Sequence, residues 1–158
     1  LLEHERTGIA GISNSIVALE GLKKRASSVK RGNGSLMDTP SFRSKIAELE
    51  IDLMAVEYTE LRSLATASAG TAPGPESSIL KLKGTEIQQG LTEIFVEAAG
   101  EYALMYPGPH GYGSNDKPSG PDFAAESLSN FLNMRKTSIY GGSNEIQKNI
   151  ISKFVLGV

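Results

Sequence analysis

Residues 39–56 read TPSFRSKIAELEIDLMAV, and this stretch decides the fold of the chain. Thr39 followed by Pro40 is typical of a helix start, because Pro at the first helical position lacks only an N–H that would have no partner there. Behind this start, apolar residues recur with a 4-3-4-3 spacing that Leu64 extends: Phe42, Ile46, Leu49, Leu53 and Val56. The spacing places them on one helix face, which predicts the seam of an antiparallel helical bundle.

Four further segments have the same helical periodicity. One precedes this stretch and fades after Ala26 into a Ser/Gly/Lys-rich loop, and one lies between Gly/Pro-rich breaks at 70–75 and 107–121. A shorter one covers about residues 122–137, and the last follows Gly141-Gly142. Their apolar positions are Ile9, Ile12, Ile16, Leu19 and Leu22; Leu80, Ile87, Leu91, Ile94, Ala98 and Tyr102; Phe123, Leu128, Phe131 and Leu132; and Ile146, Ile150 and Phe154. No segment has a strand pattern. We therefore predict an all-α domain over residues 1–158, an up-down four-helix bundle with an additional C-terminal helix.

Composition excludes several classes of function. The chain has 158 residues, 39% hydrophobic and 22% charged, which is ordinary for one globular domain. The net charge of -2 does not indicate a nucleic-acid partner, and the basic residues between Lys23 and Arg31 indicate a solvated helix end, with phosphate contact as the alternative. There is no Cys for a disulfide or metal site, and no apolar run long enough to span a membrane.

The stretch most informative about function is RKTSIYGGSNEIQKNII, residues 135–151. It predicts a helix, a Gly-Gly break and a new helix capped by Ser143 or Asn144. The start of a helix presents unpaired N–H groups and partial positive charge, and glycines in front of it let a ligand approach the backbone. Such a place suits a phosphate, a carbonyl oxygen or a flavin edge, although an ordinary corner between two helices has the same spacing.

The same stretch resembles the closing signature of the acyl-CoA dehydrogenases, in which Ile-Tyr-x-Gly-(Thr/Ser)-x-(Glu/Gln)-Ile-Gln precedes the final helix. The resemblance extends over most of the chain and corresponds to the C-terminal helical domain of that family. It implies a fragment, because the preceding helical domain and β-domain are absent and the chain starts at Leu1 without a Met. In the sequence of its two ends, the chain most resembles the large subunits of bacterial pimeloyl-CoA-type dehydrogenases.

The family desaturates acyl-CoA thioesters at the α,β-bond, and the resemblance implies which residues take part. In one branch the catalytic base is a Glu directly after the signature Tyr, but this chain has Gly141 there. Other branches place the base in a Glu-Arg pair on the first helix of the domain, which corresponds to Glu5 and Arg6. Glu5 is therefore the expected base, Arg6 its orienting neighbour and Glu3 a rival, while the Gly141 N–H is the expected donor to the thioester carbonyl.

The resemblance assigns binding roles to further residues. Tyr140, Gly141 and Gly142 are expected to line the acyl-CoA pocket, with core packing as the alternative for Tyr140. Ser143 and Glu145 match positions that contact FAD. Many members bind the flavin phosphates of a neighbouring subunit through an Arg-x-x-Phe-Gly motif, of which only Arg31 remains here.

The resemblance also implies partners. It implies FAD as cofactor, an acyl-CoA as substrate, an electron-transfer flavoprotein as electron acceptor, and assembly into a dimer or tetramer. A bacterial member would be cytoplasmic, although targeting cannot be read from this N-terminus. Two alternatives stay open. One is a non-catalytic assembly subunit of a heteromeric dehydrogenase, and the other is an unrelated helical interaction module.

Overall fold

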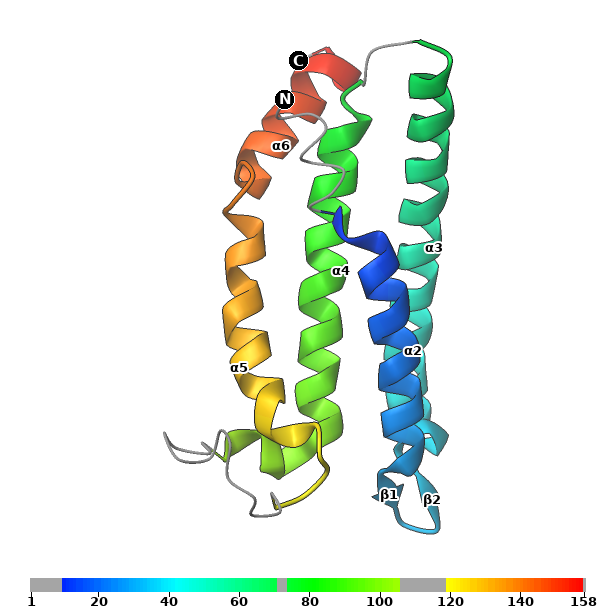
Figure 1. The fold of residues 1–158 in the computed structure, drawn as a ribbon, viewed down its shortest axis with the longest axis vertical. Helices are drawn as coiled ribbons and strands as arrows, with labels where there is room; N and C mark the ends of the chain where they lie inside the picture. The colour runs from blue at the N-terminus through cyan, green and yellow to red at the C-terminus, as the bar shows by residue number, and fades with distance from the viewer. Residues whose placement is uncertain (1–9, 71–73, 106–118, 158) are drawn as a thin grey trace.

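The computed structural model describes residues 10–70, 74–105 and 119–157 of the 158-residue chain. It confirms the all-α bundle. Four helices run alternately up and down, and a fifth helix continues from the end of the fourth (Figure 1). They are α2 (Ile12–Ser28), α3 (Pro40–Ser68), α4 (Glu76–Ala99), α5 (Ala124–Met134) and α6 (Asn144–Ile151).

Short elements complete the described chain. Two-residue strands β1 (Lys30–Arg31) and β2 (Gly34–Ser35) form an antiparallel hairpin between α2 and α3, where the sequence predicted only a loop. Three 3-10 segments are η1 (Leu36–Asp38), η2 (Gly100–Leu104) and η3 (Arg135–Ser138), and η4 (Ser152–Leu156) is a π-helical turn. The predicted helix over about 122–137 is thus shorter, because its last turn tightens into η3.

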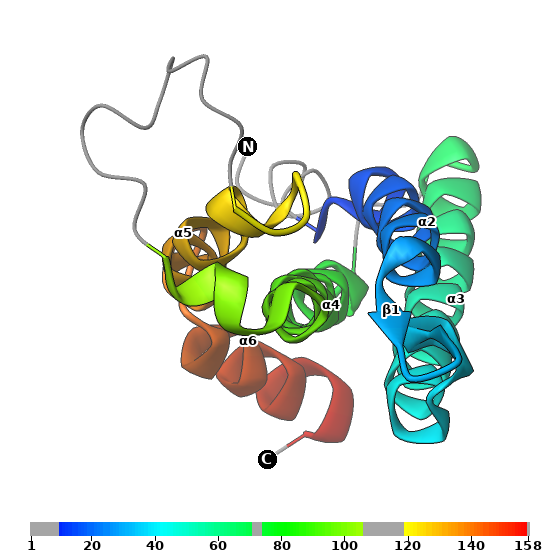
Figure 2. The same cartoon turned by 90° about the horizontal axis from the view of Figure 1, so that it is seen from below.

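Helix α4 is the centre of the bundle. Viewed along the helices, it lies between the α2–α3 pair and the α5–α6 pair (Figure 2). Leu80, Ile87, Leu91, Ile94 and Ala98 are buried as predicted, because neighbouring helices cover α4 on several sides. Tyr102 was predicted on the same face but is 39% exposed, because α4 ends at Ala99 and the chain turns away at Gly100, whose φ is 61°.

Helix α3 is buried along only part of its length. Phe42, Ile46, Leu53 and Val56 face the core, but the predicted extension to Leu64 is wrong, since Leu64 is 51% exposed. Thr39 and Pro40 occupy the predicted first positions of this helix. A second face of α3 carries exposed apolar side chains, which we call the α3 stripe: Ile51, Met54, Tyr58 and Leu61. The outer position of α3 in the bundle leaves this stripe without a covering element in the described chain (Figures 1 and 2).

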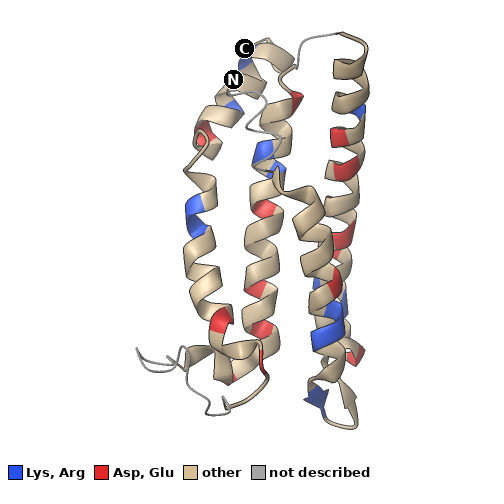
Figure 3. Cartoon of the chain, in the orientation of Figure 1, with Lys and Arg blue, Asp and Glu red and all other residues tan. Residues whose placement is uncertain are grey.

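Charged residues of both signs occur on the described helices (Figure 3). Acidic and basic positions are distributed along the long helices (Figure 3). Cross-helix ion pairs connect Lys23 of α2 with Glu50 of α3, and Lys45 of α3 with Glu97 of α4 at 2.6 Å. None of the described helices has the length and apolar character needed to cross a membrane.

Candidate functional site

The connection between α5 and α6 turns through two consecutive glycines in the left-handed region. Gly141 has φ 69° and Gly142 has φ 89°, values that residues other than glycine rarely adopt. Gly142 is also sterically restricted, because a Cβ there would lie 2.6 Å from Nε2 of the fully buried Gln147. That Nε2 donates to the Gly142 carbonyl at 3.2 Å. The glycine pair is therefore required by backbone conformation and, at Gly142, by packing.

The start of α6 follows this turn directly. Of the two predicted caps, Ser143 is the N-cap, and its hydroxyl accepts from the Ile146 N–H at 3.5 Å. Bonds from its own N–H and from the Ser143 hydroxyl lower the pKa of the Glu145 carboxyl, and the charges of Lys148 and Lys81 act in the same direction. An ionised carboxylate thus lies at the positive end of the helix, where it is favourable. In the described chain no acceptor lies against the N–H of exposed Gly141.

A buried polar cluster connects the start of α6 with α4. Lys81 Nζ donates to Asn144 Oδ1 at 2.8 Å, and Thr85 Oγ1 lies 3.3 Å from the same oxygen. Lys81 and Thr85 are both 0% exposed. Burial lowers the pKa of the Lys81 amine, while the nearby Glu145 carboxylate raises it. The glycine turn is therefore attached to the central helix through Asn144.

The end of α5 is attached to α4 by a second set of bonds. Arg135 Nη2 donates to the Gln89 carbonyl at 3.0 Å and to Thr92 Oγ1 at 3.3 Å, and its guanidinium lies over the Phe131 ring. Gln89 Nε2 in turn donates to the hydroxyl of fully buried Thr137 at 3.0 Å. Both sides of the turn are thus held by α4.

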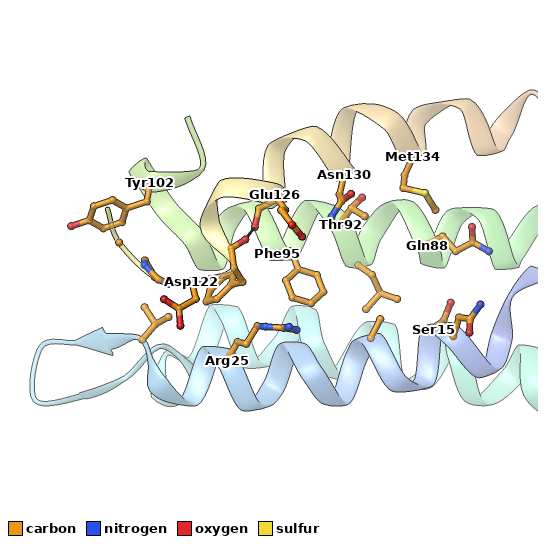
Figure 4. A pocket seen from close by; sticks show the side chains of 18 of the residues that line it. Ser15, Arg25, Gln88, Thr92, Phe95, Tyr102, Asp122, Glu126, Asn130 and Met134 are labelled. Carbon is orange, nitrogen blue, oxygen red and sulfur yellow. Dashed lines mark hydrogen bonds between the residues drawn. The ribbon is translucent and has the colours of Figure 1, made fainter. Parts of the chain in front are cut away.

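A cleft of about 1350 Å³ lies between α2, α4 and α5, and Tyr140 is among its lining residues. Ser15, Gln88 and Met134 lie toward one end of the view, and Asp122 and Tyr102 toward the other (Figure 4). Arg25 extends from α2 toward the aromatic side chain of Phe95, with its guanidinium 5.6 Å from the ring centroid and 5.9 Å from that of Phe123. The cleft therefore offers both apolar walls and polar side chains.

The structure brings together most of the predicted site residues but not all of them. Tyr140, Gly141, Gly142, Ser143 and Glu145 occupy one continuous turn. Arg31 lies in the exposed β hairpin, at the end of the bundle away from α6 (Figure 1). It therefore cannot meet the turn within one chain, and its predicted flavin role requires a neighbouring copy.

Glu5 and Arg6, with the rival Glu3, lie outside the described residues, so their roles stay predictions. The nearest described residue is Ala10. Its backbone packs so closely on α4 that a Cβ on Gly84 would lie 2.6 Å from it, and its carbonyl accepts from Gln88 Nε2 at 2.8 Å. Gly84 directly precedes Thr85, so Ala10 contacts α4 within one helical turn of the polar cluster.

Sequence reasoning missed Lys81, Thr85 and Gln147. A lysine within a helix is normally solvated, so Lys81 gave no core signal. The available signal was its helical neighbours, since Ser77, Lys81 and Thr85 repeat every four residues and form a polar strip along one side of α4. All three are buried.

Comparison with known proteins agrees with this geometry. The family model of the acyl-CoA dehydrogenase C-terminal domain matches residues 1–156. The chain belongs to the acyl-CoA dehydrogenase family. This confirms the resemblance read from residues 135–151. A search of curated protein sequences finds no match.

Several solved structures share the fold. Glutaryl-CoA dehydrogenase in complex with glutaryl-CoA has 16% identity and a TM-score of 0.75, over 99% of this chain and 36% of that one. PigA with FAD and proline has 16% identity and a TM-score of 0.77, over 99% and 37%. The ChsE4-ChsE5 complex from Mycobacterium tuberculosis has 20% identity and a TM-score of 0.69, over 93% and 36%. The chain thus spans little more than a third of the length of these proteins.

Proposed function

We propose that this chain is the C-terminal domain of an FAD-dependent acyl-CoA dehydrogenase, which removes hydrogen from the α and β carbons of an acyl-CoA thioester. The observation that carries the proposal is the Tyr140–Glu145 turn. It combines two left-handed glycines, a helix start and an N–H without an acceptor in the described chain, at the border of a large cleft. Membership of the family and the fold shared with glutaryl-CoA dehydrogenase support it.

The turn suits the carbonyl of a thioester. Removal of the α-proton leaves negative charge on the carbonyl oxygen, and an N–H already in place for that oxygen lowers the barrier. The Gly141 N–H is such a donor, and the positive end of α6 adds to its effect. Tyr140 lines the cleft, so an acyl chain whose thioester lies at the turn would extend into the cleft between α2 and α5.

Glu5 supplies the base in this proposal. Gly141 has no side chain, so the carboxylate that one branch of the family carries there is missing. Glu5 would take the α-proton as the electron pair of the α C–H bond forms the double bond, and Arg6 would keep Glu5 ionised beforehand. FAD, when bound, accepts the β-hydrogen as hydride.

The donor set of the turn fits FAD in part. The Ser143 hydroxyl and the Glu145 carboxylate present oxygens at the start of α6, where hydroxyl and N–H groups of a flavin could be bound. Arg31 carries a positive charge suited to phosphate, but only from a second copy of the chain. The FAD-bound structure of PigA, which has the same fold, supports this cofactor.

The α3 stripe supports the assembly of this protein into an oligomer. Ile51, Met54, Tyr58 and Leu61 are each more than half exposed, and such contiguous apolar surface marks an interaction site. We therefore propose a dimer or tetramer. An electron-transfer flavoprotein as electron acceptor and a cytoplasmic location are further proposals, supported by the resemblance to bacterial members.

The decisive experiment uses the complete protein and the Glu5→Gln variant. Glutamine keeps the shape of Glu5 but cannot accept the proton, so flavin bleaching by an acyl-CoA under anaerobic conditions should slow by about 10²–10⁴-fold. FAD content should be unchanged. Bleaching at the wild-type rate would show that Glu5 is not the base.

The loss of most of the flavin-phosphate motif around Arg31 favours a second candidate, a non-catalytic subunit that assembles with a catalytic relative. The ChsE4-ChsE5 complex has the same fold. The two candidates differ in a simple measurement. A catalytic subunit purified alone should carry flavin absorbance, whereas an assembly subunit should be colourless and acquire flavin only with its partner.

A further inference from the structure

Two lysines of α4 that are two residues apart have opposite surroundings. Lys83 is solvated, with 47% of its side chain exposed and an ion pair to Glu86 at 2.9 Å. Lys81 is 0% exposed. Burial of an ammonium group is costly unless hydrogen bonds compensate for the lost water. The contacts of Lys81 beneath α6 must therefore compensate for the water that its ammonium group has lost.

The partner of Lys81 is the first residue of α6. Its ammonium and the Thr85 hydroxyl both approach Oδ1 of Asn144, at 2.8 and 3.3 Å. An amide oxygen has two lone pairs, so both contacts can exist together. Asn144 comes three residues after Gly141, and Ser143 between them caps the helix. The buried side chains of α4 thus bond the end of the glycine turn.

Few side-chain hydrogen bonds define the position of helix α6 against α4 in the described chain. It is eight residues long, and a helix of this length is not stable by itself. Ile146 is 51% exposed, and the one buried side chain of the helix, Gln147, bonds the carbonyl of Gly142 within the same turn. Among the described residues, the hydrogen bonds between the side chains of α4 and α6 are those of Lys81 and Thr85 with Asn144.

We propose that Lys81 is a positioning residue, whose buried ammonium acts through Asn144 to hold the Gly141 N–H where a thioester carbonyl would accept from it. This inference rests on the proposed function. A donor displaced by about 1 Å can slow a reaction by about 10²-fold, because catalysis requires the reacting atoms to be aligned. An error in the position of the turn would therefore lower the rate far more than it lowers stability.

The test uses the complete protein with Lys81→Met, which keeps the stem but removes the donor. The matched control is Lys83→Met, which changes the same residue type on the solvated face of the same helix. Hydrogen exchange, followed by mass spectrometry, reports on the peptide over residues 139–151. Anaerobic flavin bleaching by an acyl-CoA reports on the reaction. We expect Lys81→Met to accelerate exchange in this peptide and to slow bleaching by about 10–100-fold, with exchange in α3 unchanged. Lys83→Met should change neither.

A second variant keeps the test decisive if Lys81→Met does not fold. Asn144→Ala removes the acceptor, and it should accelerate exchange in the same peptide. In the double variant the two effects should not add, because both substitutions break one contact. Unchanged exchange in the single variants, or faster exchange with a wild-type bleaching rate, would overturn the proposal. If the wild-type protein itself holds no FAD, the proposed function fails, and the exchange measurement still decides whether Lys81 holds the turn.

Discussion

The α5–α6 turn and the α2–α3 hairpin both bend through glycines with positive φ, but they are held in different ways. Gly32 in the hairpin has φ 56°, and a Cβ there would have no atom within 4 Å. Local contacts form the hairpin, including the Leu36 N–H to the Val29 carbonyl at 2.8 Å. In contrast, Gly142 is packed against a buried side chain, and remote residues of α4 hold the turn. A left-handed glycine therefore does not by itself mark a functional site, whereas its attachment to the core is informative.

Replacing Gly142 or Gly32 by alanine should give the largest difference between the two turns. In Gly142→Ala the left-handed conformation costs about 1–2 kcal/mol, and the displaced Gln147 amide loses its bond, for about 1–3 kcal/mol more. Gly32→Ala carries only the conformational cost, about 1–2 kcal/mol. We expect flavin bleaching in the complete protein to slow by about 100-fold for Gly142→Ala and to be unchanged for Gly32→Ala. Equal rates in the two variants would remove the distinction between the turns.

The Gln147 side chain is expected to have the next largest effect. Gln147→Leu keeps the volume but leaves the Gly142 carbonyl without its donor, which should cost about 1–3 kcal/mol of local stability. Hydrogen exchange over residues 139–151 measures this cost. Part of this loss of stability is offset, because Gln147 Oε1 is itself buried without a partner in the described chain and leucine removes this unsatisfied atom. Exchange as slow as in the wild type would mean that Lys81 and Asn144 suffice to hold the turn.

Sequence patterns predicted the two turns to different extents. The Gly141-Gly142 break and a cap at Ser143 or Asn144 followed from residue type, since glycine before a capping residue has a clear conformational meaning. The hairpin was predicted only as a loop, because two-residue strands leave no alternation to detect. The attachment through Lys81 could not be predicted, because the hydrogen bond joins residues 63 positions apart in the sequence.

The spacing of apolar residues predicted burial correctly at some positions of the helices but not at others. Phe42, Ile46, Leu53 and Val56 are buried as their spacing predicted. Leu64 and Phe154 have equally good spacing, yet they are 51% and 67% exposed. A periodic pattern identifies a face that is suited to packing, but it does not say whether that face packs within the same chain. For the end of α3 and for η4, we expect the covering surface to come from elsewhere.

Arg31 gives a smaller effect that tests the role of the hairpin. Because it lies at the opposite end of the bundle from the turn, Arg31→Ala should leave the turn intact and change only FAD retention through a neighbouring copy. We expect FAD affinity to fall by about tenfold, as for the loss of one exposed charge-assisted bond of about 1.5 kcal/mol. The control is Lys30→Ala, the adjacent exposed residue of β1. Equal losses in the two variants would indicate a general effect of charge rather than a specific contact.

The smallest expected effect concerns the capping box of η1, the short segment that directly follows the hairpin. Bonds from the backbone N–H and hydroxyl of Ser35, at 2.7 and 2.8 Å, lower the pKa of the Asp38 carboxyl below its usual value of 3.8. Since the folded state holds this proton less tightly than the unfolded state, the carboxylate contributes stability above pH 3.8 and loses it as the pH falls through the lowered pKa. Asp38→Asn should therefore be less stable than the wild type at neutral pH, and the difference should vanish in acid. Unfolding measured from pH 7 downward, together with an NMR titration of Asp38, checks this. The exchange rate over residues 139–151 should be the same in both proteins, because the hairpin is held locally and no bond among the described residues connects it to the turn held by Lys81.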